Sequence, residues 1–431
     1  MSTKTKQWGA IIVMIALFAM IAFVTNLCSP MAVIVKNQFG ASNFLSQIGN
    51  YGNFIAYLIM GIPSGMLIKK YGYKKTALIA LTVGIIGILV QWASGKMGFG
   101  VYLIGAFIAG FCMCMLNTVV NPMLNLLGGG GNKGNQLIQI GGVFNSAAAV
   151  AVYILMGALI GEATKAKISD ATPALLIALA IFVIGFIVIL FTKIEEPQQP
   201  VEVKSEVKDK YSAFSFRHFK LGILAIFLYG GIEVGTPTYI LQYLTSEPTA
   251  ATPGLGMSGT IAGLIVAVYW LMMLIGRFIG GAIGGKVSSK AMVTAVSIAA
   301  IALVLFGMLA PQSWQVNVPG IDWANLKVIW AQVPVGIFAF ILVGLCTSVM
   351  WGGIFNLAVE GLGRYTEKAS GIFMALVCGG GILPLLQNAI VDGLGGVGYL
   401  QSYWVIVIGL AFLLFYALWG SKNVNKDIPV E

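Results

Sequence analysis

Glu233 is the residue with the clearest capacity for chemistry, because it lies inside a long apolar segment. The other Asp and Glu residues fall in expected loops, segment ends or tails. A carboxylate at bilayer depth is costly, so it usually faces a polar cavity and marks a functional site. We identify no Lys or Arg at comparable depth in any segment and therefore expect Glu233 to lack a cationic partner. It could load and release a proton, or accept a hydrogen bond from a ligand hydroxyl.

Uncharged polar side chains form a second group of candidates, because they recur at helical spacing in apolar segments. Asn117 and Asn121, for example, are one helical turn apart. An amide can donate and accept hydrogen bonds, which suits a polyhydroxylated ligand. The alternative is that these side chains bind other helices and hold a bundle together. The candidates for binding hydroxyl groups are Asn26, Asn117, Asn121, Gln139 and Asn145.

Two tryptophans, Trp270 and Trp351, could stack against a sugar ring, although packing between helices or facing lipid would also explain them. Enzymatic chemistry is not expected. The single histidine, His218, is predicted at a segment edge, so neither a Ser-His-Asp triad nor a histidine-based metal site can form. The glycine-rich stretch 128–134 lacks the Gly-Lys-Ser/Thr ending of a phosphate loop. We predict no cofactor and no metal.

These candidates must be positioned by membrane-spanning helices. Of the 431 residues, 58% are hydrophobic and only 9% are charged, whereas a soluble domain has about a quarter charged residues. A bilayer core needs about 20 mostly apolar residues per helix. Twelve segments meet this requirement, roughly at 8–35, 44–68, 76–95, 100–126, 136–161, 172–192, 219–245, 258–285, 290–310, 329–358, 368–391 and 398–420.

A charged stretch divides the twelve segments into two groups of six. Residues 193–220 contain eleven of the forty charged side chains, which indicates a solvated linker. We therefore predict an N-terminal bundle at 1–193, a cytoplasmic linker at 194–217 and a C-terminal bundle at 218–431. Two six-helix halves are the architecture of a major facilitator transporter, whose site lies between the halves near the midplane.

The basic residues indicate orientation. Twenty of the 25 Lys and Arg residues fall on the side of the expected termini and linker, and five fall on the other side. Because cytoplasmic loops are enriched in Lys and Arg, both termini are predicted to be cytoplasmic. This placement explains the basic charge without nucleic-acid binding. The five cysteines lie in apolar segments, and we expect buried reduced thiols.

Several stretches make the chain resemble the fucose:proton symporter family of the major facilitator superfamily, and within it the glucose/galactose transporter branch. They are NTVVNPMLNLLG (117–128), FNS (144–146), FLYGGIEVG (227–235), YWLMMLIGRFIGG (269–281) and IFNLAVEGLGRYTEKASGIFMALVCGGGILPLLQ (354–387). Fucose symporters have acidic residues in the first and fourth spans, at positions that match Ser29 and Asn117. The glucose/galactose branch lacks these acids and has a glutamate that matches Glu233, so the branch resemblance fits better.

We therefore expect an all-α polytopic transporter that imports a neutral monosaccharide, such as glucose, galactose, mannose or fucose, across the inner membrane. Glu233 would couple transport to a proton or sodium ion or recognise the sugar, and Lys70 and Arg277 would act in gating. The absence of a midplane cation favours a neutral ligand. The alternatives are a transporter of sialic or uronic acids, a transporter of amphipathic compounds, and a membrane sugar sensor that does not transport. A monomer in the lipid bilayer is expected.

Overall fold

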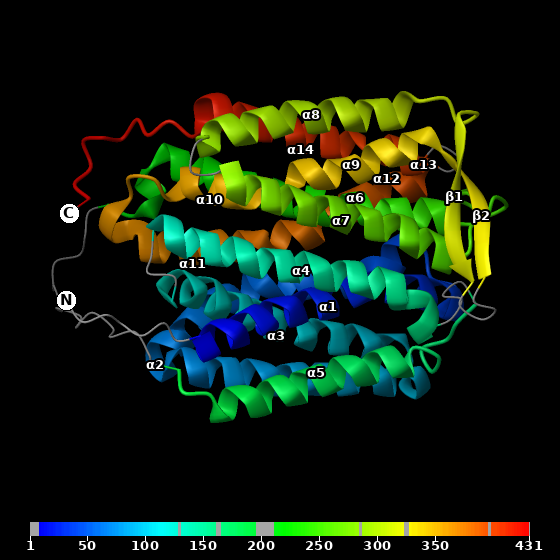
Figure 1. The fold of residues 1–431 in the computed structure, drawn as a ribbon, viewed down its shortest axis with the longest axis horizontal. Helices are drawn as coiled ribbons and strands as arrows, with labels where there is room; N and C mark the ends of the chain where they lie inside the picture. Colours follow the sequence, from blue (N-terminus) through cyan, green and yellow to red (C-terminus); the bar gives the residue numbers. More distant parts are fainter. Residues whose placement is uncertain are drawn as a thin grey trace.

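The computed structural model describes residues 8–127, 131–160, 165–194, 211–283, 287–322, 327–394 and 398–430. The helices run roughly along the long axis of an elongated bundle (Figure 1). Both chain termini lie at one end of this bundle, and a two-stranded hairpin lies at the other. We refer to these ends as the terminus side and the hairpin side.

The N-terminal half consists of long helices that cross from one side to the other. They are α1 (Trp8–Phe39), α2 (Asn43–Met97), α3 (Phe99–Leu127), α4 (Gly131–Ile160) and α5 (Thr172–Phe191). α2 contains two predicted spans, because the chain turns at Gly72, whose φ of 80° favours glycine. Lys74 follows this turn and donates from Nζ to the carbonyl oxygens of Leu190 (3.0 Å) and Thr192 (2.8 Å) at the end of α5. A lysine here satisfies carbonyls that the helix end leaves unpaired.

The C-terminal half has more and shorter helices. They are α6 (Arg217–Thr245), α7 (Gly259–Ile283), α8 (Ser289–Leu309), α9 (Val335–Thr347), α10 (Met350–Val359), α11 (Thr366–Ala375), α12 (Gly379–Leu394), α13 (Gly398–Ser402) and α14 (Trp404–Phe415). In addition to a break at Tyr403 between α13 and α14, two of the predicted spans are interrupted in their middle. α9 and α10 are separated at Ser348 and Val349, and α11 and α12 are separated by a 3₁₀ turn at Leu376–Cys378.

The predicted all-α polytopic fold of two six-helix bundles is confirmed. Eleven stretches of the described residues are helical, long and apolar enough to span a membrane, and α4 adds a shorter apolar helix at Ile140–Leu155. The proposed division into 1–193, 194–217 and 218–431 stays a prediction, because residues 195–210 of the linker lie outside the described part of the chain.

The hairpin is the main difference from the expected elements. β1 (Gln315–Asp322) pairs antiparallel with β2 (Lys327–Pro334), in the register Gln315↔Pro334. Residues 311–328 were expected to form a loop and 329–358 a span, but the strand takes the first six residues of that span. Exposed and half-buried residues alternate along β2 from Val328 to Gln332, and this period suits a strand with one face more exposed than the other.

Close contacts join the two halves on the hairpin side. The hydroxyl oxygens of Tyr51 and Tyr239 are 3.2 Å apart, and the amide of Asn388 donates to the Tyr51 hydroxyl. Gly380 and Gly381 of α12 lie directly against α2. A Cβ at Gly380 would be 2.8 Å from the Phe54 ring, and one at Gly381 would be 2.6 Å from the Tyr51 carbonyl oxygen. The halves are therefore packed tightly together from this end as far as the middle of the bundle, where Gly380 also lies against Gly230 of α6.

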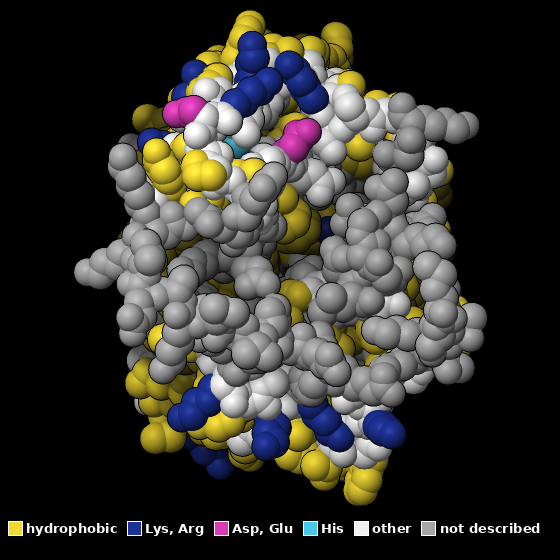
Figure 2. Space-filling model, turned by 90° about the vertical axis from the view of Figure 1, so that its left-hand side faces the viewer, with side chains coloured by type: hydrophobic (Ala, Val, Ile, Leu, Met, Phe, Trp, Pro, Cys, Tyr) yellow, Lys and Arg dark blue, Asp and Glu magenta, His cyan; other side chains and the backbone are white. Residues whose placement is uncertain are grey.

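The terminus side is different. Figure 2 shows this face hollowed at its centre, between the two bundles, with hydrophobic side chains visible inside. Lys and Arg side chains gather near the upper and lower edges of the same face. The halves therefore meet on the hairpin side and leave a depression on the terminus side.

Candidate functional site

A cavity of about 170 Å³ lies between the two halves and is lined by side chains from both. The N-terminal half contributes residues of α1 to α4, and the C-terminal half contributes residues of α6, α7 and the two interrupted spans. Almost all the candidates predicted from the sequence meet here: Asn26, Asn117, Asn121, Asn145, Glu233, Trp270, Trp351 and Arg277 line the cavity.

Glu233 and Arg277 form the charged part of the cavity. Nη2 of Arg277 lies 3.7 Å from Oε1 of Glu233, and the two side chains are 13% and 22% exposed, respectively. The prediction that no cationic side chain lies at the depth of Glu233 is therefore wrong. Arg277 lies six residues before the end of α7, which places its backbone about 9 Å inside the helix end, and its long side chain extends to the carboxylate.

Arg277 also binds the opposite half of the protein. Its Nη1 donates to the carbonyl oxygen of Gly142 at 2.5 Å, to Ser146 Oγ at 2.8 Å and to Asn145 Oδ1 at 3.5 Å. All three acceptors are on α4, whereas Glu233 is on α6. One guanidinium thus connects an acidic side chain of its own half with neutral acceptors of the other. The predicted gating role of Arg277 stays a prediction.

The asparagines of the N-terminal half use their NH₂ groups within the protein. Asn26 Nδ2 donates to the Ala22 carbonyl at 2.8 Å, Asn121 Nδ2 to the Asn117 carbonyl at 3.0 Å, and Asn117 Nδ2 to the Tyr57 hydroxyl at 2.7 Å. Asn145 Nδ2 likewise donates to the Phe18 carbonyl at 2.9 Å. These bonds fix the orientation of the amides.

The oxygen atoms of the same amides are less occupied. Asn121 Oδ1 is buried and has no hydrogen-bond partner among the described residues. A buried acceptor without a partner is costly, so a water or ligand donor in the cavity would stabilise it. The hydroxyl of Thr25, next to Asn26, is buried and unpartnered in the same sense. The N-terminal wall of the cavity therefore contains two buried oxygen atoms, Asn121 Oδ1 and Thr25 Oγ1, whose hydrogen-bonding capacity is unused among the described residues.

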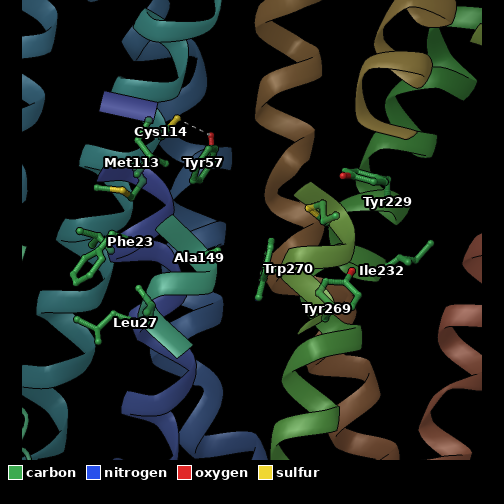
Figure 3. Packing of buried hydrophobic residues seen from close by; sticks show 14 of the residues in the cluster. Phe23, Leu27, Tyr57, Met113, Cys114, Ala149, Tyr229, Ile232, Tyr269 and Trp270 are labelled. Atoms are coloured by element: carbon green, nitrogen blue, oxygen red, sulfur yellow. Dashed lines mark hydrogen bonds between the residues drawn. The ribbon is translucent and has the colours of Figure 1, made fainter. Parts of the chain in front are cut away.

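The C-terminal wall presents aromatic rings. Trp270 is only 7% exposed, packs edge-on against Tyr269 at a centroid distance of 5.5 Å, and has no partner for Nε1 within the described part of the chain. Figure 3 shows Trp270 projecting from the C-terminal half toward the space between the bundles. Trp351 stacks on Phe355, with ring centroids 5.8 Å apart. An aromatic face and a free indole N–H can together bind an amphipathic ring with an oxygen acceptor.

Two predicted site residues do not join this group. Lys70 is exposed, and its Nζ lies 5.0 Å from the centre of the Tyr71 ring. It is not among the residues that line the cavity. Gln139 belongs to α4, but its side chain lies outside the described residues. The structure therefore leaves the role of each as a prediction.

The sequence analysis missed Tyr57, Thr25 and Ser348, which also line the cavity. Tyr57 is 5% exposed and holds Asn117 in position through its hydroxyl. Its polar tip inside an apolar segment was the available signal, since a buried tyrosine hydroxyl usually has a partner. Ser348 follows α9, at the interruption before α10, which hydropathy does not reveal.

Neither a cysteine nor a histidine is among the described residues that line this cavity. The five cysteines are buried and unpaired, as predicted. Among the described residues, no three His, Cys, Asp or Glu side chains are grouped in a way that could hold a metal ion. His218 lies elsewhere, with Nε2 2.9 Å from the Glu360 carbonyl oxygen.

A cavity that contains polar side chains at the interface of two six-helix bundles is typical of a secondary transporter. The family model described as Major Facilitator Superfamily matches residues 13–385, and the chain belongs to this family. This membership identifies the protein as a member of a transporter family.

Individual proteins give a narrower comparison. The chain is 29% identical to the "Glucose/galactose transporter" of Brucella abortus biovar 1 (strain 9-941) over 432 residues, which cover 98% of this chain and 97% of the relative. It is 22% identical to the "L-fucose-proton symporter" of Escherichia coli (strain K12), covering 95% and 93%. The fold is similar to the crystal structure of the transporter FucP in the outward conformation, with a TM-score of 0.70, 21% identity, and coverage of 96% of this chain and 99% of that one.

Proposed function

We propose that this protein is a secondary active transporter that imports a neutral monosaccharide by alternating access, with a proton or sodium ion as the coupled cation. The observation that carries this proposal is the cavity between the halves, which asparagines of the N-terminal half and tryptophans of the C-terminal half line together. Sugar hydroxyls can donate to amide oxygens, and the apolar face of a sugar ring suits an aromatic surface. The names of the two relatives, which refer to glucose, galactose and fucose, support the same ligand class.

The roles of individual residues follow from their positions. Asn26, Asn117, Asn121 and Asn145, with Gln139 as a further candidate, would bind hydroxyl groups. Trp270 and Trp351 would contact the ring. Glu233 would bind the coupling proton or sense the coupling cation, and Lys70 and Arg277 would act in gating.

Alternating access requires the cavity to open first to one side and then to the other. Contacts at Tyr51, Tyr239 and Asn388 join the halves on the hairpin side, and the depression lies on the terminus side. We place the transporter in the inner membrane as a monomer, with both termini in the cytoplasm. The depression then opens toward the cytoplasm, so this arrangement corresponds to the inward-facing state. Import would end with release of the sugar toward the terminus side.

A neutral ligand is favoured by the charge balance of the cavity. Glu233 and Arg277 are the two charged side chains among the described residues that line it, and they have opposite signs. A neutral sugar leaves this pair intact, whereas a sialic or uronic acid would add a third charge. A neutral ligand is therefore favoured because the cation Arg277 is paired with Glu233, and not because the cavity lacks a cation.

Transport in proteoliposomes tests the proposal directly. Purified protein is reconstituted, and uptake of labelled glucose, galactose, mannose and fucose is measured with and without an inward proton or sodium gradient. We expect saturable uptake of at least one neutral hexose and stimulation by one of the gradients. Saturable binding without counterflow would instead indicate a sensor, and transport of only acidic sugars or amphipathic compounds would contradict the proposed ligand class.

The role of Glu233 is tested in the same assay with Glu233→Gln. We expect the variant to lose stimulation by the gradient, because glutamine has a similar shape but no titratable group. Glu360→Gln is a matched control, since Glu360 is an exposed carboxylate at the end of α10. Unaltered gradient dependence in Glu233→Gln would remove its coupling role.

A further inference from the structure

We infer that Glu233 also determines the charge selectivity of the cavity, by neutralising Arg277 and so excluding sugars that carry a carboxylate. This inference rests on the proposed function, because it concerns which sugars the same cavity accepts. It assigns Arg277 a latent capacity to bind anions that the glutamate suppresses. Two contacts of Arg277 carry the argument, one with Glu233 and one with α4.

The two terminal nitrogen atoms of the Arg277 guanidinium have different partners. Nη1 donates to three neutral acceptors on α4, including Ser146 Oγ at 2.8 Å. Nη2 faces Oε1 of Glu233 at 3.7 Å, which is an ion pair but too long for a normal hydrogen bond. The Nη2 donors of Arg277 are therefore neutralised by a nearby charge without being tightly held. A guanidinium in this position is the group that proteins use to bind carboxylates.

The charged side chains that line the cavity balance each other. The described cavity lining contains one acidic and one basic side chain, and its other polar members are amides, hydroxyls and two indoles. Tyr57 and Tyr153 contribute hydroxyls from the N-terminal half, and no other Asp, Glu, Lys, Arg or His is among the described lining residues. The formal charge of the lining is therefore zero when Glu233 is ionised.

Adding an anion to this cavity has an electrostatic cost. A sugar carboxylate in the intact cavity would lose its hydration and would meet an arginine already compensated by Glu233. A buried charge without its own partner is strongly unfavourable. A neutral sugar avoids this cost. Selectivity would thus arise from a repulsive element against acidic sugars in addition to the attractive contacts with hydroxyl groups.

Removal of the glutamate charge should reverse this preference. Glu233→Gln keeps the size of the side chain but leaves Arg277, which is 13% exposed, with only neutral acceptors. A ligand carboxylate could then supply the missing negative charge at Nη2. We expect the variant to bind glucuronate about tenfold more tightly than the wild type, which is the lower end of the coupling found for close charge pairs.

The experiment measures binding of glucuronate and of glucose to purified protein by isothermal titration calorimetry, at neutral pH. Four proteins are compared: wild type, Glu233→Gln, the double variant Glu233→Gln/Arg277→Gln, and the exposed-carboxylate control Glu360→Gln. The expected gain appears in Glu233→Gln and is absent from the double variant and from the control. Thermal unfolding of each protein verifies folding, and Glu233→Asn replaces Glu233→Gln if the latter does not fold.

Two results would overturn the inference. One is a folded, charge-free variant at position 233 with no gain for glucuronate, and the other is a gain that persists when Arg277 is also replaced. Failure of the proposed function is a separate result, since it would appear as wild-type protein that neither binds nor transports any neutral hexose. In the wild type, glucuronate bound as tightly as glucose would likewise contradict the inference, whereas the proposed function would stand because a neutral hexose still binds.

Discussion

The two halves of the protein line the same cavity with different chemistry. The N-terminal half contributes asparagines whose NH₂ groups are fixed by backbone carbonyls and a tyrosine, whereas the C-terminal half contributes the ion pair and the tryptophans. The local backbone differs as well. α1, α3 and α4 are single helices, but the spans that carry Trp351 and Met374 are interrupted beside the cavity.

This difference suggests a division of labour between two bundles of similar architecture. Amides on continuous helices have defined positions, which suits recognition of hydroxyl groups. Interrupted helices near the midplane are typical of transporter binding sites, and a 3₁₀ turn within a helix often marks a hinge. The N-terminal half is therefore suited to recognise the hydroxyl groups of the ligand, and the C-terminal half to contact its ring, to respond to charge and to move.

The largest effect on transport is expected from replacing Arg277, which contacts both Glu233 and the acceptors on α4. Arg277→Gln breaks the ion pair with Glu233 and the charge-assisted bonds to α4. Breaking a buried pair costs about 3 kcal/mol, so we expect a roughly hundredfold loss of transport together with a lower unfolding temperature. Uptake in proteoliposomes and thermal unfolding measure the two effects. Lys290→Gln, at an exposed position of α8, is the control. Transport within twofold of wild type would show that the halves do not depend on this bridge.

A smaller effect, on KM for the sugar alone, is expected from replacing Asn121 in the N-terminal wall of the cavity. Asn121→Ala removes an unpartnered acceptor, so we expect KM for the sugar to rise about tenfold, equivalent to about 1.4 kcal/mol for one lost hydrogen bond in a buried site. Stimulation by the cation gradient should be retained, because Glu233 is untouched. Initial uptake rates over a range of sugar concentrations, with and without the cation gradient, distinguish a change in KM from a change in gradient stimulation. The exposed Asn317→Ala of β1 is the control. Loss of gradient stimulation without a change in KM would contradict the division between the halves.

The smallest effect is expected from Trp270→Phe, which keeps an aromatic ring and removes the indole N–H. If the unpartnered Nε1 donates to the sugar, affinity should fall about threefold to tenfold, as for one neutral hydrogen bond. Binding measured by titration calorimetry gives the value, and Trp330→Phe on the exposed face of the hairpin serves as control. An unchanged affinity would limit the role of Trp270 to its ring.

Much of the fold could be predicted from the sequence, because a bilayer imposes a length and a composition on every span. Most of the cavity-lining candidates were identifiable too, since polar residues are rare in such spans and recur at helical spacing. The pairing of Arg277 with Glu233 could not be predicted, because position along a helix does not show how far a long side chain extends inward. Nor do the residues around Ser348 include a proline that would signal the end of α9, so this interruption was missed.

The glycines at the start of α12 have a consequence for how the halves separate. Gly380 and Gly381 bring α12 so close to α2 that even a methyl group would collide with Phe54 or the Tyr51 carbonyl. A contact made largely by bare backbone has few interlocking side chains to disengage, so it can open and close again without repacking a core. The same contact tolerates no additional atoms when closed. The middle of the interface therefore sets a strict limit on what can lie between the two halves when they are closed.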